Sequence, residues 1–142
     1  MEIQRLASKD YERIVEVWEK AGLPFRPVGR DSKKNLTSQL KSNRVIILGA
    51  VDENELVGVV MVTHDGRKGW INRLAVIPEY QHKGIACKLI HESETLLSKK
   101  GYEVYCVLIE KDRDESGQLF LKLGYKEEKE IAYFTKRIRK DA

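Results

Sequence analysis

The sequence predicts a mixed α/β fold whose sheet is antiparallel in its first half and gains a parallel strand later. Three β-branched runs follow one another with only short charged turns between them, which is typical of consecutive antiparallel strands. A strand, a helix and another strand come next, an order that requires a right-handed crossover between parallel neighbours. A chain of 142 residues has the usual size of one domain, so we expect a single domain over residues 1–142.

The N-terminal part is expected to form a strand, a helix, a loop and a second helix. Alternating residues in EIQRLA predict the strand, and apolar residues at helical spacing from Tyr11 to Ala21 predict the first helix. Ser8 or Asp10 is expected to cap that helix, and Gly22 to stop it. The two prolines and the glycine of LPFRPVGR predict a loop. A weaker helix follows, with the Asp31 carboxylate as its expected N-cap.

The rest of the chain is expected to complete the sheet. RVIILGAV, LVGVVMVTH and WINRLAVI are the three antiparallel strands, and a helix runs from Gly84 to Gly101 before the strand EVYCVLI. The segment DRDESGQLFLKLGY predicts another helix, which ends at Gly124. Two short strands, beginning at Tyr125 and Ile131, are expected to finish the chain.

Composition favours a soluble protein of the cytoplasm. No apolar run reaches the roughly 18 residues of a membrane helix, and MEIQRLASKD lacks the order of a signal peptide, so we expect a cytoplasmic protein without a membrane partner. The net charge is +4, but the charges are interspersed except at KRIRK, so we expect no nucleic-acid partner. Cys87 and Cys106 have no metal or redox spacing and are expected to be reduced thiols.

We expect no metal site. DRDESG begins like a calcium loop, but Leu123 stands where the bidentate glutamate belongs. Cys87 and His91 share a helix face, yet a zinc site needs further ligands that are absent nearby.

The stretch RLAVIPEYQHKGIACKLI predicts a strand, a turn and a helix that begins after Gly84. The start of a helix has N–H groups without partners and a partial positive charge, so it can bind an anion such as phosphate. Gly84 allows a close approach of the backbone, and Lys83 and Lys88 add positive charge. Neither of the two familiar glycine-rich phosphate motifs is present, and an ordinary strand-to-helix connection remains the alternative.

LAVIPEYQHKGIACKLI resembles the acetyl-CoA signature of the GNAT superfamily of N-acyltransferases, in which Q/R-x-x-G-x-G/A follows a strand. The later segment FLKLGY resembles the end of the family's next helix. The resemblance implies a single-domain GNAT-like mixed sheet with an antiparallel N-terminal half, a parallel splayed pair of strands at the acyl-CoA site, and helices on both faces. A bulge in WINRLAVI would part that strand from EVYCVLI.

The same resemblance implies which residues bind acetyl-CoA. Main-chain groups of three strand residues would hold the pantetheine arm, and the loop and helix start would hold the pyrophosphate. The implied strand residues are Leu74, Ala75 and Val76, and the implied loop residues are Gln81, His82, Lys83, Gly84, Ile85, Ala86 and Cys87. Acetyl-CoA is the acyl-donor substrate in this interpretation.

No catalytic residue can be assigned from the resemblance. Phe120 stands where many family members have a tyrosine that protonates the CoA thiolate, so Tyr125, Tyr133 or water would have to replace it. Leu108 lies near the position of the family's glutamate base, and Glu110 lies two residues further on. Glu110, Tyr125 and Tyr133 are therefore weak candidates.

Several polar loop residues are candidates to face the acceptor, although a solvated loop is the alternative for each. They are Arg26, Arg30, Asp31, His64 and Asp65.

The leading functional hypothesis is an N-acetyltransferase that moves the acetyl group from acetyl-CoA directly to a primary amine of a peptide, protein or small molecule. The alternative is a non-catalytic module that senses acyl-CoA, and a third hypothesis is nucleic-acid binding through the basic C-terminus. The partners would be acetyl-CoA and an amine-bearing acceptor, and the sequence leaves a homodimer open.

Overall fold

The computed structural model describes residues 1–142 and contains one five-stranded sheet with the order β1-β2-β3-β4-β5. Neighbours from β1 to β4 pair antiparallel, and β5 pairs parallel with β4. The mixed sheet with an antiparallel first half is therefore confirmed. The strands are β1 (Glu2–Arg5), β2 (Val45–Asp52), β3 (Glu55–His64), β4 (Gly69–Val76) and β5 (Tyr105–Cys106).

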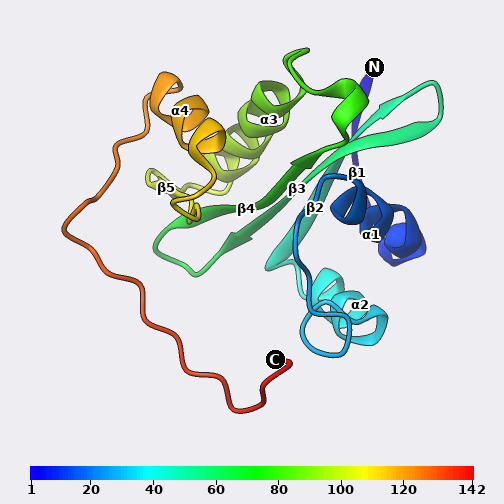
Figure 1. Cartoon of the computed structure of the whole chain (residues 1–142), viewed down its shortest axis with the longest axis horizontal. Helices are drawn as coiled ribbons and strands as arrows, with labels where there is room; N and C mark the ends of the chain where they lie inside the picture. Colours follow the sequence, from blue (N-terminus) through cyan, green and yellow to red (C-terminus); the bar gives the residue numbers. More distant parts are fainter.

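Helices cover both faces of the sheet, as expected (Figure 1). In that view α3 and α4 lie on one side of the strands, and α1 and α2 lie on the other. No helix of the structure combines the length and the apolar character needed to cross a membrane. The helices are α1 (Tyr11–Lys20), α2 (Lys33–Lys41), α3 (Ile85–Lys99) and α4 (Asp114–Lys122), with short 3-10 turns η1 (Ser8–Asp10) and η2 (Pro78–Tyr80).

The core lies on both sides of β3. All residues from Leu56 to Val62 are buried, because α1 covers one face of this strand and α3 the other. Trp18 of α1 is 1% exposed, and Leu89 and Leu97 of α3 are fully buried. Each such side chain contributes roughly 1.5–3 kcal/mol through burial. The neighbouring strand β4 therefore pairs with a strand that is buried on both faces.

The N-cap of α2 differs from the expectation. Ser32, and not Asp31, caps the helix: its hydroxyl accepts a hydrogen bond from the main-chain N–H of Asn35 at 3.1 Å. The Asp31 carboxylate instead accepts from the main-chain N–H of Arg26 at 2.7 Å, inside the preceding loop. Asp31 is 4% exposed, so its carboxylate serves the loop and not the helix.

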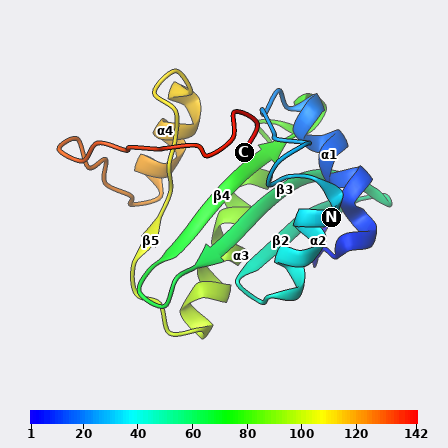
Figure 2. The same cartoon turned by 90° about the horizontal axis from the view of Figure 1, so that it is seen from below.

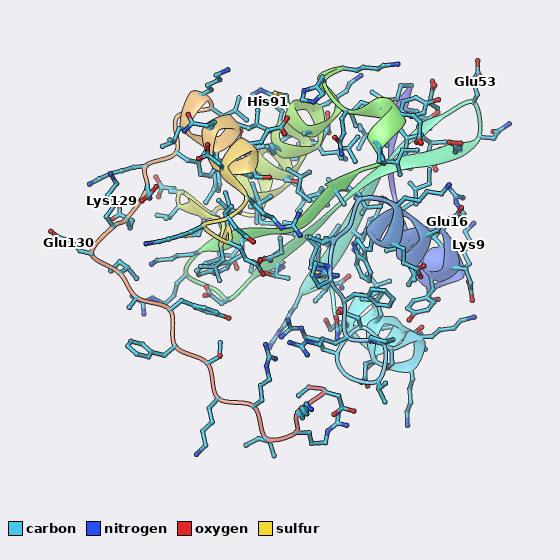
Figure 3. The ribbon with its side chains drawn as sticks, viewed as in Figure 1. Lys9, Glu16, Glu53, His91, Lys129 and Glu130 are labelled. Atoms are coloured by element: carbon cyan, nitrogen blue, oxygen red, sulfur yellow. The ribbon has the colours of Figure 1, made fainter.

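The two C-terminal strands predicted from Tyr125 and Ile131 are absent. Residues 126–142 form neither helix nor strand, and Figure 3 shows their Lys129 and Glu130 on a segment well away from the sheet. The strand EVYCVLI is likewise reduced to β5, Tyr105–Cys106. A ladder of several residues needs a partner edge of similar length, and β5 offers only two residues. The exposed apolar residues of this segment are Ile131, Tyr133, Phe134 and Ile138.

Candidate functional site

A gap in the strand pairing opens on one side of β4. Its only pairs with β5 are Gly69 with Tyr105 and Trp70 with Cys106, at the very start of β4. β4 continues to Val76, while β5 and the chain after it move away from it (Figure 2). The edge of β4 beyond Trp70 thus has no neighbouring strand, so its main-chain groups on that side are available to an extended ligand.

A β-bulge lies in the same part of β4. Beyond the pair of Val59 with Ala75, pairing resumes two residues away on β3 but three residues away on β4. The extra residue leaves Arg73 with a φ of 55°, in the left-handed region that few residues other than glycine adopt. A bulge increases the local twist of its strand. It accounts for the parting of β4 and β5, and it is the feature that the family resemblance implied.

The loop from Gln81 to Gly84 delivers a row of unpaired N–H groups. The main-chain N–H groups of residues 82–87 donate no hydrogen bond within the protein, and the next one, of Lys88, donates to Gly84 O at 3.1 Å. Two residues of the loop have positive φ, His82 at 63° and Gly84 at 83°. Consecutive N–H groups at a helix start form a binding site suited to an anion.

This loop is fastened to the end of β4. The Gln81 side-chain amide donates to Val76 O at 2.9 Å, and the Tyr80 hydroxyl donates to Asp52 Oδ2 at 3.0 Å. The unpaired loop N–H groups therefore lie directly beyond the unpaired edge of β4. Residues 74–76 and 81–87, the two halves of the implied cofactor site, are thus linked by the contact of Gln81 with Val76.

Positive charge accompanies the loop. Lys83 Nζ lies 5.3 Å from the centroid of the Tyr80 ring, and exposed Lys88 follows on the first turn of α3. His82 Nε2 lies 3.4 Å from Glu115 Oε1 of α4, with both side chains largely exposed. Since α3 also presents its positive end here, the region attracts an anion, although Glu115 opposes this locally.

The side chains proposed as proton donors do not gather at this surface. Phe120 is buried and packs edge-on against Tyr125, with ring centroids 5.0 Å apart. The Tyr125 hydroxyl donates to Glu94 Oε2 at 2.7 Å, and burial, followed by Glu94, raises the pKa of Tyr125 far above its usual value. Tyr133 is 71% exposed, in a segment without a strand. Glu110 is an exposed residue between β5 and α4.

The acceptor candidates are divided between two ends of the molecule. His64 and Asp65 belong to the β3–β4 turn, which is the far end of β4 from the loop. His64 Nδ1 lies 2.9 Å from the Tyr102 hydroxyl, and Asp65 Oδ1 accepts from two N–H groups of its own turn. By contrast, Asp31 lies beside the bulge, with its Oδ2 4.0 Å from Arg73 Nη2.

Residues 4–125 match the sequence family known as the acetyltransferase (GNAT) family. The chain belongs to this family. An acetyltransferase of Sodalis glossinidius (strain morsitans) is 29% identical over 141 residues, which cover 99% of this chain and 98% of the relative. An acetyltransferase of Photorhabdus laumondii is 30% identical over 139 residues, 97% of this chain and 96% of the relative.

Solved structures of GNAT enzymes share the fold. The crystal structure of the PaiA N-acetyltransferase of Thermoplasma acidophilum in complex with coenzyme A has a TM-score of 0.78 and 26% identity, covering 88% of this chain and 89% of that one. An aminoglycoside acetyltransferase from a soil metagenome, in complex with trehalose, has a TM-score of 0.80 and 22% identity, covering 97% and 96%. The second likeness concerns the fold alone.

One feature of this GNAT chain was missed at the level of sequence. The guanidinium carbon of Arg73, at the bulge, lies 4.4 Å from the centroid of the Trp18 ring, and its Nη1 donates to Pro24 O at 2.5 Å. The signal was a charged residue inside the mainly apolar strand WINRLAVI. Its partners, Trp18 and Pro24, lie on α1 and the α1–α2 loop. They are far from Arg73 in the sequence, so the contact was not predicted.

The structure has no group of three or more His, Cys, Asp or Glu side chains arranged to hold a metal ion. Cys87 and Cys106 form no disulfide.

Proposed function

We propose that residues 1–142 form one N-acetyltransferase domain that transfers the acetyl group of acetyl-CoA directly to a primary amine. The observation that carries this proposal is the row of unpaired main-chain N–H groups at residues 82–87, placed next to the unpaired edge of β4. A pyrophosphate needs several hydrogen-bond donors, and a pantetheine amide chain needs an open strand edge. Both requirements meet at one place on this surface.

In this proposal the pantetheine arm lies along Leu74–Val76 and the pyrophosphate lies on residues 82–87. The Thermoplasma PaiA enzyme, which is 26% identical, has coenzyme A bound in its crystal structure, and this supports the choice of ligand. The side chain of Ile85 is buried in the core, so this residue would contribute its N–H group alone. A Cβ added at Gly84 would meet no atom within 4 Å, so there is open space for phosphate oxygens beside it.

The chemistry forms a C–N bond between the amine and the thioester carbonyl carbon and breaks the C–S bond of the thioester. The amine must lose a proton, and the CoA sulfur must gain one. A main-chain N–H of residues 74–76 would stabilise the oxyanion, a contribution of about 3 kcal/mol in comparable sites. Tyr125 is committed to Glu94 and Phe120 has no proton to give, so we assign the proton transfers to water and keep Glu110 as a weak carboxylate candidate for the base.

The test is thiol release from acetyl-CoA in the presence of amines of different classes: a peptide N-terminus, a lysine peptide, spermidine and kanamycin. Release that depends on an added amine, with the acetylated amine identified by mass spectrometry, would support the proposal. Binding of acetyl-CoA without thiol release for any amine would favour a non-catalytic acyl-CoA sensor instead.

A further inference from the structure

The buried side-chain N–H groups that lack a hydrogen-bond partner all lie in one place. They belong to Trp18 Nε1, Arg73 Nε and Arg73 Nη2. The two side chains are stacked, with 4.4 Å between the guanidinium carbon and the indole centroid. Trp18 is 1% exposed, and the side chain of Arg73 is 20% exposed. The chain thus contains a single buried cluster of unsatisfied side-chain donors, and it is next to the bulge.

Keeping this cluster is costly for the free protein. An unpaired buried donor costs about 1–3 kcal/mol, and native proteins contain few of them. Arg73 also has a positive φ, which is a strained conformation for a residue other than glycine. Desolvation lowers the pKa of Arg73, which is the direction expected when burial disfavours a charge. Strain and unpaired donors that occur together next to a reaction centre are typical of a ligand site.

The chemistry of the cluster limits what can bind there. An indole N–H and a guanidinium have donors and no acceptors, so their partner must supply lone pairs. A carboxylate supplies two oxygens and pairs with two neighbouring guanidinium N–H groups at once. The nearest carboxylate of the chain, Asp31, stays 4.0 Å from Nη2 because its Oδ2 already accepts from the Arg26 N–H.

We propose that the acceptor is an amine that carries a carboxylate, and that Arg73 and Trp18 bind this carboxylate. The inference rests on the proposed function and names its substrate class. Arg73 immediately precedes Leu74, where the pantetheine arm would begin. A carboxylate bound by the Arg73 guanidinium therefore places the amine of the same acceptor close to the thioester. Polycationic amines such as aminoglycosides lack the group that the cluster requires.

Binding also requires movement of the α1–α2 loop. The unpaired atoms are covered in the free protein, and the loop is held by two arginines: Arg73 Nη1 donates to Pro24 O, and Arg113 Nη2 donates to Gly22 O at 3.1 Å. Two hydrogen bonds of this kind are worth only a few kcal/mol together. A carboxylate that binds Nε and Nη2 of Arg73 forms new hydrogen bonds, and these offset the free energy lost when the α1–α2 loop moves away.

The experiment compares acceptors in which the carboxylate is replaced by a neutral amide, with rates referred to the concentration of unprotonated amine. Free amino acids and the corresponding amino-acid amides are assayed for thiol release, leucine against leucinamide and glycyl-leucine against glycyl-leucinamide, with kanamycin as the polycation. We expect kcat/KM for the acid to exceed that for the amide by about tenfold or more, the factor typical of a hydrogen bond to a charged group.

Variants separate ligand binding from a structural role. Trp18→Phe removes the N–H and keeps an aromatic ring, and Arg73→Gln removes the charge. Trp70→Phe and Arg67→Gln are matched controls, since Trp70 Nε1 already contacts Asp65 and Arg67 lies in the exposed β3–β4 turn. We expect the acid-to-amide ratio to fall toward one in the first two variants, with the KM for acetyl-CoA unchanged, and to persist in the controls.

A purely structural role predicts equal losses for acid and amide, and it would overturn the inference. Because Trp18→Phe could fail to fold, Arg73→Gln is the deciding variant if the melting temperature of the other falls steeply. Release with neutral or cationic amines only, or an acid-to-amide ratio of one or below, overturns this inference alone. No thiol release with any amine overturns the proposed function itself.

Discussion

The hydroxyl of Tyr125 donates a 2.7 Å hydrogen bond to Glu94 Oε2, which joins the chain just beyond α4 to α3. Glu94 Oε1 in turn lies 3.6 Å from His91 Nδ1 on the same helix. The first contact ties the chain just beyond α4 to α3, and the second lies within α3. The hydroxyl proton of Tyr125 is therefore held in a hydrogen bond to Glu94, whereas a catalytic acid would have to release its proton to the CoA sulfur.

Replacing Tyr125 by Phe is expected to lower stability and to preserve activity. One hydrogen bond to a partly buried carboxylate is lost, so the free energy of unfolding should fall by about 1–2 kcal/mol, measured by denaturant titration. Thiol release should remain within a few fold of wild type. A fall of about 10² or more in kcat with an intact fold would identify Tyr125 as the acid after all.

The same residue predicts a dependence of stability on high pH. The pKa of Tyr125 is raised above its ordinary value of 10.0 in the folded protein, mainly by burial. A group with a raised folded pKa contributes stability that is complete below its unfolded pKa and is lost as pH rises above it. The advantage of wild type over Tyr125→Phe should thus be constant up to about pH 9 and shrink above about pH 10. A difference in unfolding free energy between wild type and Tyr125→Phe that stays constant above about pH 10 would contradict the raised pKa of Tyr125.

Tyr102 links the β3–β4 turn to the end of α3. Its oxygen accepts from the Gly66 N–H at 2.9 Å, so its own proton is directed to His64 Nδ1 at 2.9 Å, and His64 Nε2–H then donates to Asn43 O at 3.0 Å. We expect Tyr102→Phe to cost about 1–3 kcal/mol, because several groups lose their partner. Nitrogen-15 NMR should find neutral His64 protonated on Nε2; the Nδ1–H form would refute this network.

Gly84 and Gly66 allow a controlled test of the loop. Both have positive φ, 83° and 88°, and a Cβ added at either would meet no atom within 4 Å. Replacing either glycine by Glu should cost about 1–2 kcal/mol through the left-handed backbone. Only Gly84→Glu should also abolish binding of acetyl-CoA, measured by calorimetry, because it puts a negative charge among the phosphate-binding N–H groups. Equal affinities for acetyl-CoA in the two variants would exclude this loop as the phosphate-binding site.

Local periodicity was sufficient for most of the fold. The alternation and β-branching of the runs that became β2, β3 and β4 identified the antiparallel half, and Gly84 and Gly101 marked the limits of α3. These features depend on residues adjacent in sequence, or on glycines that take positive φ. The loop signature was identified for the same reason, because its N–H groups are consecutive in the chain.

What the sequence could not supply depends on tertiary partners. The run IAYFT from Ile131 has strand propensity, but a strand needs an edge, and β5 is too short to offer one. Asp31 is a good N-cap residue, yet the Arg26 N–H in its own loop bonds its carboxylate first. The stack of Arg73 on Trp18 joins a strand to a distant helix, and no local pattern indicates it.

A thermal-shift titration with acetyl-CoA, with free CoA and ATP as comparators, tests the central claim most directly. At about 100 times its dissociation constant a ligand adds roughly 2.7 kcal/mol of stability, which raises the melting temperature by several degrees for a chain of this size. We expect acetyl-CoA and CoA to raise it and ATP to leave it unchanged. No shift with acetyl-CoA or CoA at about millimolar concentration would contradict the account, since the loop at residues 82–87 would then be an ordinary connection.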